Sequence, residues 1–340
     1  MNDSYDAILV VSFGGPEGPD EVIPFLENVL RGKNVPRERM LEVAEHYQHF
    51  GGVSPINAQN RALIAALERE LAAHGPHLPV YWGNRNWAPF LADTLTQMKQ
   101  AGIKRALAFF TSTFSSYSGC RQYREDIQRA QDEVGAGTPD VDKLRVFYNH
   151  PGFIEASAAR AREALNQIPE ARRDKATILY SAHSIPLAMA AGCRYETQLR
   201  ESARLVSESL GGHPWHLVYQ SRSGPPQQPW LEPDICDLIK ELGAEGDVED
   251  VVIVPIGFVS DHMEVLFDLD TEAKAVGNEL GINVVRAKTV GVHPRFITMI
   301  RELIEERMSG TAERPALGEM GASHDVCPVD CCLRTTEAQR

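Results

Sequence analysis

The sequence lacks an excess of basic residues, a long hydrophobic run and a leader-like start, and each absence excludes a class of protein. Its 34 Lys and Arg residues face 47 Asp and Glu residues, which gives a net charge of −13. Nucleic-acid binding depends on a basic surface, so we expect no DNA or RNA partner. No apolar stretch approaches the roughly 20 residues that cross a bilayer, so we expect no transmembrane segment.

The start of the chain and its cysteines indicate the compartment. No basic segment precedes the short apolar run at residues 7–13, so we expect no signal peptide and a cytoplasmic protein. In that compartment the six cysteines are expected to be thiols or metal ligands rather than disulfides. Nucleotide motifs are also missing: Gly14-Gly15-Pro16 follows the first apolar run, but neither G-x-G-x-x-G nor a P-loop is present.

Short apolar runs rich in β-branched residues alternate with helical patterns. Strands are expected at residues 6–13, 78–83, 105–111, 143–148, 177–182, 215–220, 250–257 and 283–286. Helical patterns lie at residues 20–31, 37–50, 56–73, 119–133, 196–209, 263–280 and 295–308. Such alternation predicts an α/β fold with parallel sheets. We expect two tandem Rossmann-like lobes, each with a four-stranded parallel sheet flanked by helices, and an active cleft between them.

The expected domains are an N-terminal lobe over residues 1–114, a C-terminal lobe over residues 115–308 and a tail over residues 309–340. A chain of 340 residues suits two domains. The tail begins with a stretch rich in Gly, Ala, Glu and Ser, a composition typical of disorder. It then contains three cysteines, which predict that a bound metal anchors it.

Two motifs follow expected strands of the C-terminal lobe. The first is Ser181-Ala182-His183-Ser184-Ile185-Pro186, and the second runs from Gly257 to Glu264 with the sequence GFVSDHME. Both lie at carboxyl ends of strands, where open α/β sheets bind ligands. A neutral imidazole at His183 can accept protons near neutral pH. The alternative is a hydrogen-bonded turn residue without a catalytic role.

Acidic residues continue beyond the second motif as Glu264, Asp268 and Glu272. Spacings of four residues place all three on one face of a helix. Like charges at this spacing cost about 0.2–0.5 kcal/mol per pair. The stripe is either a solvated acidic face or a path of oxygen ligands for a hard or borderline cation.

Three thiols, Cys327, Cys331 and Cys332, lie within six residues of the tail. A fourth ligand would come from elsewhere, and Cys120 at the start of an expected helix is favoured over Cys193 and Cys236. Four thiolates suit either an iron–sulfur cluster or tetrahedral zinc.

The two motifs, together with residues 10–16, 50–55 and 220–222, resemble the ferrochelatase family, whose members insert ferrous iron into a porphyrin during haem biosynthesis. The resemblance covers about residues 5–308. It implies a lyase-class metal chelatase with porphyrin and Fe²⁺ as substrates and transient contacts with other haem-pathway proteins. The compact form resembles the bacterial type that uses coproporphyrin III.

The resemblance also implies roles for individual residues. His183 and Glu264 would be the catalytic pair and would meet the metal, which Asp268 and Glu272 would guide. Propionate contacts would come from Arg31, Ser54 and Tyr123. Phe13 would lie at the substrate, where some bacterial members carry an iron-ligating tyrosine, and His46 replaces an arginine that binds a propionate in some members. The cysteines resemble the cluster-bearing branch, in which Cys120, Cys327, Cys331 and Cys332 would hold a [2Fe–2S] cluster.

Insertion must remove two pyrrole protons and strip water from Fe²⁺, so we expect His183 to accept protons and the carboxylates to deliver metal. A basic patch of Arg31, Lys33, Arg37 and Arg39 could receive several carboxylates, which favours coproporphyrin III, with four propionates, over protoporphyrin IX, with two. The rivals are a protoporphyrin IX ferrochelatase, a cobalt or sirohydrochlorin chelatase with metal-ligating histidines, and a non-catalytic tetrapyrrole-binding iron–sulfur sensor.

Overall fold

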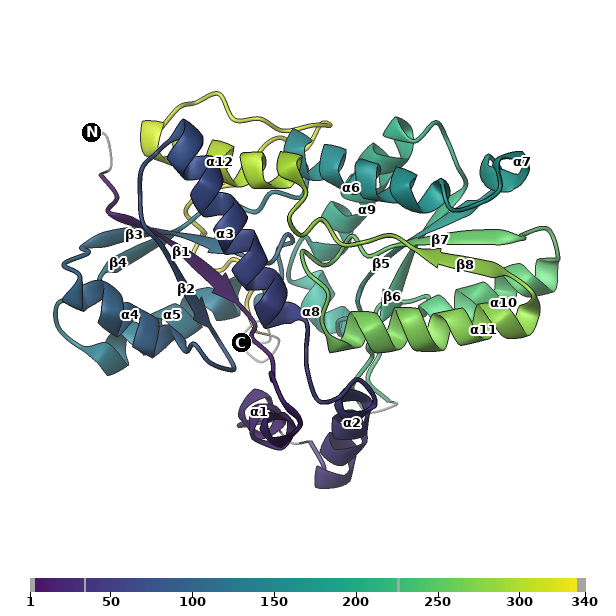
Figure 1. The fold of residues 1–340 in the computed structure, drawn as a ribbon, viewed down its shortest axis with the longest axis horizontal. Coiled ribbons are helices and arrows are strands. Elements are labelled where there is room, and N and C mark those ends of the chain that lie inside the picture. Colours follow the sequence, from purple (N-terminus) through teal and green to yellow (C-terminus); the bar gives the residue numbers. More distant parts are fainter. Residues whose placement is uncertain (1–3, 34, 225–226, 335–340) are drawn as a thin grey trace.

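The chain forms two lobes, each built on one parallel four-stranded sheet (Figure 1). The computed structural model describes residues 4–33, 35–224 and 227–334, so the last part of the expected tail, 335–340, lies outside the described residues. The strand orders, β2-β1-β3-β4 and β6-β5-β7-β8, confirm the α/β prediction of two Rossmann-like lobes. The strands are β1 (Ala7–Ser12), β2 (Val80–Asn84), β3 (Arg105–Phe110), β4 (Asp140–Lys143), β5 (Thr177–His183), β6 (Trp215–Gln220), β7 (Asp250–Val254) and β8 (Asn283–Arg286).

Helices cover both faces of each sheet, which explains why β1 and β7 are buried along their whole length. The α-helices are α1 (Val22–Val29), α2 (Arg37–His49), α3 (Ile56–His74), α4 (Leu91–Gln100), α5 (Gln122–Val134), α6 (Pro151–Leu165), α7 (Glu170–Arg173), α8 (Leu187–Ala191), α9 (Tyr195–Ser209), α10 (Ile235–Glu245), α11 (Lys274–Leu280) and α12 (Pro294–Ser309). A short 3₁₀ turn, η1 (Pro19–Glu21), precedes α1, and two π-helical segments, η2 (Tyr117–Arg121) and η3 (Val265–Ala273), precede α5 and α11. Helices α1 and α2 form a small pair set apart from both sheets (Figure 1).

One continuous hydrophobic core joins the two lobes. It contains Ile8 and Leu107 of the first sheet, Phe153 of α6, Ile178 of the second sheet and Phe296 of α12. Helix α12 follows the second sheet in the chain but packs against α3 of the first lobe as well as α6. The two lobes are therefore packed on a shared core.

The fourth strand and the domain boundary differ from the sequence prediction. Strand β4 ends at Lys143, whereas residues 143–148 were expected as the strand. Leu144, Phe147 and Tyr148 are buried, but in the core that joins the lobes rather than in the sheet. Because β4 pairs with β3, a division at residue 114 would cut the first sheet, so the first lobe extends to at least Lys143.

The tail packs against the rest of the chain through polar contacts. The Arg145 guanidinium is buried, pairs with Glu306 of α12 at 2.6 Å and donates to the carbonyl of Pro315 at 2.8 Å. Asn149 donates to the carbonyls of Leu317 and Gly321 at 3.0 and 2.9 Å. The tail is thus attached to the body before it reaches the cysteines.

Within the described ranges, none of the helices combines the length and apolar character that crossing a membrane requires.

Candidate active site and cysteine site

His183 is the last residue of β5, a central strand of the second sheet. The Tyr195 hydroxyl donates to the backbone carbonyl of His183 at 3.0 Å, which fixes the strand end. The ring Nδ1 contacts the carbonyl oxygen of Ser184. A carbonyl can only accept, so Nδ1 carries a proton, and in the neutral form of the ring Nε2 presents a lone pair. His183 therefore offers a proton acceptor on the side that faces Glu264.

Glu264 lies where the chain enters η3, beyond the end of β7. Its Oε2 is 3.7 Å from Nε2 of His183 and 4.0 Å from Nδ1 of His262. The Gln220 side chain donates to the backbone carbonyl of Glu264 at 3.2 Å, so the end of β6 also supports this segment. The structure brings the expected pair together at the carboxyl ends of parallel strands.

The acidic stripe lies on a π-helical segment rather than on the continuous helix expected over residues 263–280. Such segments are rare and are often found at functional sites. Burial, and then the nearby Glu264 carboxylate, raise the pKa of Asp268 to about 7. Glu272 is largely exposed, yet partial desolvation and then the Asp234 carboxyl raise its pKa. Asp268, in the middle of the stripe, is therefore influenced by both of the other acids, since Glu272 also raises its pKa.

Two residues that support Asp268 were not predicted as site residues. The Ser221 hydroxyl and the Gln220 amide, the latter at 3.2 Å, both donate to Oδ2 of Asp268. Ser221 has a φ of 62°, in the left-handed region that L-residues rarely adopt. Both residues follow the rule that polar groups at strand ends line the site, since Gln220 ends β6 and Ser221 comes next.

His262 also lies beside the His183–Glu264 pair and was not predicted as a site residue. Desolvation lowers its pKa, and the Glu264 carboxylate acts against this shift. A neutral imidazole at this position adds no positive charge beside the Glu264 carboxyl group.

The expected propionate contacts lie in different environments. Arg31 is exposed in the turn after α1. Ser54 is buried, and its backbone N–H donates to the carbonyl of Pro16 at 2.8 Å. Tyr123 is also buried, with the Arg85 guanidinium 4.4 Å from its ring centroid. Arg31 is thus open to solvent, whereas Tyr123 is buried with Arg85 over its ring.

Phe13 lies half exposed at the end of β1, with the same Arg85 guanidinium 5.8 Å from its ring centroid. Lys33 is a member of the basic patch that interacts electrostatically with Glu264. Desolvation and then Arg85 lower the pKa of Lys33, whereas Glu264 acts in the opposite direction. His46 stacks on Phe267 of η3, with ring centroids 3.7 Å apart, so it joins α2 to the acidic segment.

The four expected thiols converge although Cys120 is about two hundred residues from the others. Cys120 is buried in η2, and its thiol hydrogen-bonds to Cys327, which raises the pKa of Cys120 and lowers that of Cys327. Sγ of Cys331 lies 3.6 Å from Sγ of Cys332. Cys332 has a φ of 55°, another left-handed residue, and burial raises the pKa of its thiol. Four convergent thiols fit a soft metal centre such as an iron–sulfur cluster.

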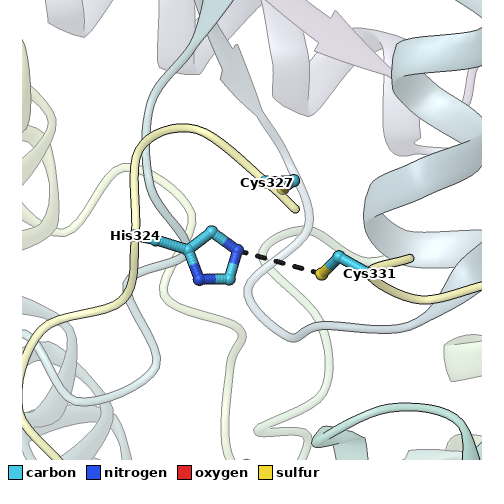
Figure 2. Close-up of side chains that lie close together, drawn as sticks. All are labelled: His324, Cys327 and Cys331. Atoms are coloured by element: carbon cyan, nitrogen blue, oxygen red, sulfur yellow. Dashed lines mark hydrogen bonds between the residues drawn. The ribbon is translucent and has the colours of Figure 1, made fainter. Parts of the chain in front are cut away.

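His324 was not predicted as part of this site. Its Nε2 lies 3.8 Å from Sγ of Cys331, and the ligand atoms of His324, Cys327 and Cys331 lie within 4.8 Å of one another (Figure 2). The signal available in the sequence was its position three residues before Cys327.

Known proteins are similar to this chain in fold and, in other cases, in sequence. A solved structure described as SirB from Bacillus subtilis with Fe³⁺ has a TM-score of 0.57 at 13% identity, covering 90% of this chain and 97% of that chain. It supports the fold alone. A protein named ferrochelatase from Rhodopirellula baltica is 62% identical over 331 residues, covering 97% of this chain and 94% of its own length.

A protein named coproporphyrin III ferrochelatase from Streptomyces coelicolor is 53% identical over 350 residues, covering 96% of this chain and 93% of its own length. Residues 5–308 match the family model described as ferrochelatase. The range that matches the family model includes both strand ends that carry the histidine and the acids. The chain therefore belongs to the ferrochelatase family of metal chelatases.

Proposed function

We propose that the protein inserts Fe²⁺ into coproporphyrin III, with His183 as the proton acceptor and Glu264 as the residue that delivers the metal. The observation that carries this proposal is the 3.7 Å separation between Nε2 of His183 and Oε2 of Glu264. A free imidazole nitrogen can take the pyrrole protons, and a carboxylate can replace water on the incoming cation. The free cysteines suit a cytoplasmic protein, where thiols stay reduced.

Asp268 and Glu272 would guide Fe²⁺ to Glu264. Asp268 lies beside Glu264 and accepts from Ser221 and Gln220, so it is held in place while it is partly desolvated. Carboxylates arranged in a line let a hydrated cation exchange one oxygen ligand for the next. A sirohydrochlorin-type chelatase would instead rely on metal-ligating histidines.

The choice of coproporphyrin III is supported by accessible positive charge and by relatives. Arg31 is exposed in the turn after α1, and Lys33 interacts electrostatically with Glu264. The relative from Streptomyces coelicolor carries coproporphyrin III in its name. A substrate with four propionates can use these cations more fully than one with two.

A [2Fe–2S] cluster would be held by Cys120, Cys327, Cys331 and Cys332. When bound, it would supply a one-electron redox centre that also crosslinks the tail to η2. The catalytic pair lies on other segments, so the cluster would stabilise the protein or sense oxidation. Hydrogen bonds also hold the cysteine-bearing part of the tail beside η2, because Arg121 donates to the carbonyls of Val329 and Cys331 at 2.8 and 3.3 Å.

The first prediction concerns the porphyrin. The value of kcat/KM for anaerobic Fe²⁺ insertion should be at least about tenfold higher with coproporphyrin III than with protoporphyrin IX, since one extra charge-assisted hydrogen bond contributes about 1.5 kcal/mol. Arg31→Ala should reduce the difference, while Arg69→Ala on α3 serves as a control. A clear preference for protoporphyrin IX would refute the substrate assignment.

The second prediction uses the raised pKa of Asp268, which is about 7. Only the carboxylate can ligate Fe²⁺, so kcat/KM for Fe²⁺ should rise with pH through about 7, and Asp268→Asn should remove this rise. Because the folded-state pKa lies above the unfolded value of about 3.9, the metal-free protein should lose stability as pH rises through about 7. Asp268→Asn should not show this loss.

Urea unfolding at pH 5 and pH 8 measures the stability part of this prediction, with Asp247→Asn in the exposed loop after α10 as the control. Equal changes in wild type and Asp268→Asn would show that Asp268 does not titrate in this range.

The third prediction concerns the cluster. Anaerobically purified protein should be brown, with visible charge-transfer bands and about two irons and two sulfides per chain. Cys120→Ser should lose the colour and unfold at lower temperature, whereas Cys236→Ser on α10 should keep both. Colourless wild-type protein with stoichiometric zinc would rule out the cluster.

A further inference from the structure

His324 has no part in the four-thiolate cluster, yet it lies against two of the thiols. Its imidazole hydrogen-bonds to Cys327, and its Nε2 is 3.8 Å from Sγ of Cys331. Figure 2 shows the ring pointing from its own turn of the tail towards Cys331. Nitrogen and two sulfurs together form a mixed donor set, which differs from the all-sulfur set of the cluster.

The turn that carries His324 is held by one contact with the first lobe and one contact within the tail. The Lys143 ammonium, at the end of β4, donates to the backbone carbonyl of His324 at 3.5 Å. The next residue, Asp325, forms an ion pair with Arg314 at 2.9 Å. These contacts hold the backbone, while the His324 side chain is exposed. The imidazole is thus positioned before any metal binds and remains open to solvent.

The separations match those around a single tetrahedral ion. With Zn–S distances of about 2.3 Å and Zn–N distances of about 2.0–2.1 Å, the edges of such a tetrahedron are about 3.8 Å for S···S and about 3.6 Å for S···N. The Cys331–His324 separation is 3.8 Å, and all three ligand atoms lie within 4.8 Å of one another. Small side-chain rotations, chiefly of the exposed His324, would therefore close the site around one ion.

We propose that His324, Cys327 and Cys331 form a binding site for a single thiophilic divalent cation of the Zn²⁺ class. Two thiol protons leave to solvent as the ion binds, and water or an adjacent thiolate takes the fourth position. This inference goes beyond the [2Fe–2S] assignment, with which it shares two cysteines, and stands without it. Its consequence is that the tail has a second metal state, which keeps it attached when no cluster is present.

The test uses full-length, cluster-free, reduced protein titrated anaerobically with Co²⁺ as a spectroscopic probe. One equivalent should bind with near-ultraviolet thiolate charge-transfer bands and intense visible bands of tetrahedral Co²⁺. Co²⁺ held by the oxygens of Glu264 and Asp268 would give no thiolate bands. His324→Ala should weaken the thiolate site at least about tenfold, since even loss of an outer-shell partner costs about 10–100-fold.

Two variants make the result specific to the imidazole. His324→Cys should restore tight binding with stronger charge-transfer bands, because it replaces nitrogen with sulfur. His77→Ala, in the exposed loop before β2, should bind as wild type does. Co²⁺ binding by His324→Ala or His324→Cys with wild-type affinity and wild-type bands would overturn the proposal.

Cluster reconstitution, carried out on the same protein in parallel, separates the proposal of a single-ion site at His324 from the proposal of a [2Fe–2S] cluster. Wild-type protein that forms no [2Fe–2S] centre but shows His324-dependent Co²⁺ bands would refute the cluster alone. Protein that forms the cluster but binds Co²⁺ independently of His324 would refute the single-ion site alone.

Discussion

The parallel pairing of β5 with β7 is the constraint on which the active site depends. Because the two strands run in the same direction, their carboxyl ends lie at one edge of the sheet, and His183 and the segment leading to Glu264 leave that edge together. Gly257 permits the close approach, since a Cβ there would lie 2.7 Å from Cα of Ala182. A side chain at this glycine would push apart the two segments that carry the pair.

The concentration of negative charge beyond this edge has an energetic cost that the fold only partly offsets. Burial and mutual repulsion favour the protonated form of Asp268, while hydrogen bonds from Ser221 and Gln220 act against it. Ser221 makes its hydrogen bond to Asp268 from a left-handed backbone conformation. Strained backbone and unfavourable charge at one place are typical of functional sites.

Much of this arrangement could be predicted from the sequence, because strand periodicity and the strand-end rule are local signals. Eight strands, two lobes and the approach of His183 to Glu264 all follow from them. The position of β4 could not be predicted, because the strand consists mainly of charged residues, whereas the apolar residues that follow it, Leu144, Val146, Phe147 and Tyr148, are buried in the core that joins the lobes. The π-helical form of η3 and the burial of Tyr123 under Arg85 depend on tertiary packing. His324 was missed because its importance arises only when the tail folds back.

The central claim is that His183 and Glu264 divide proton transfer and metal delivery between them. Anaerobic Fe²⁺ binding and single-turnover insertion, measured in the same preparations, test it most directly. His183→Ala should bind Fe²⁺ as wild type does but insert it at least about a hundredfold more slowly. Glu264→Gln should weaken Fe²⁺ binding about tenfold or more. His216→Ala, at the opposite end of β6 from the site, is the control. Near-normal insertion by His183→Ala, or unchanged Fe²⁺ affinity in Glu264→Gln, would contradict the account.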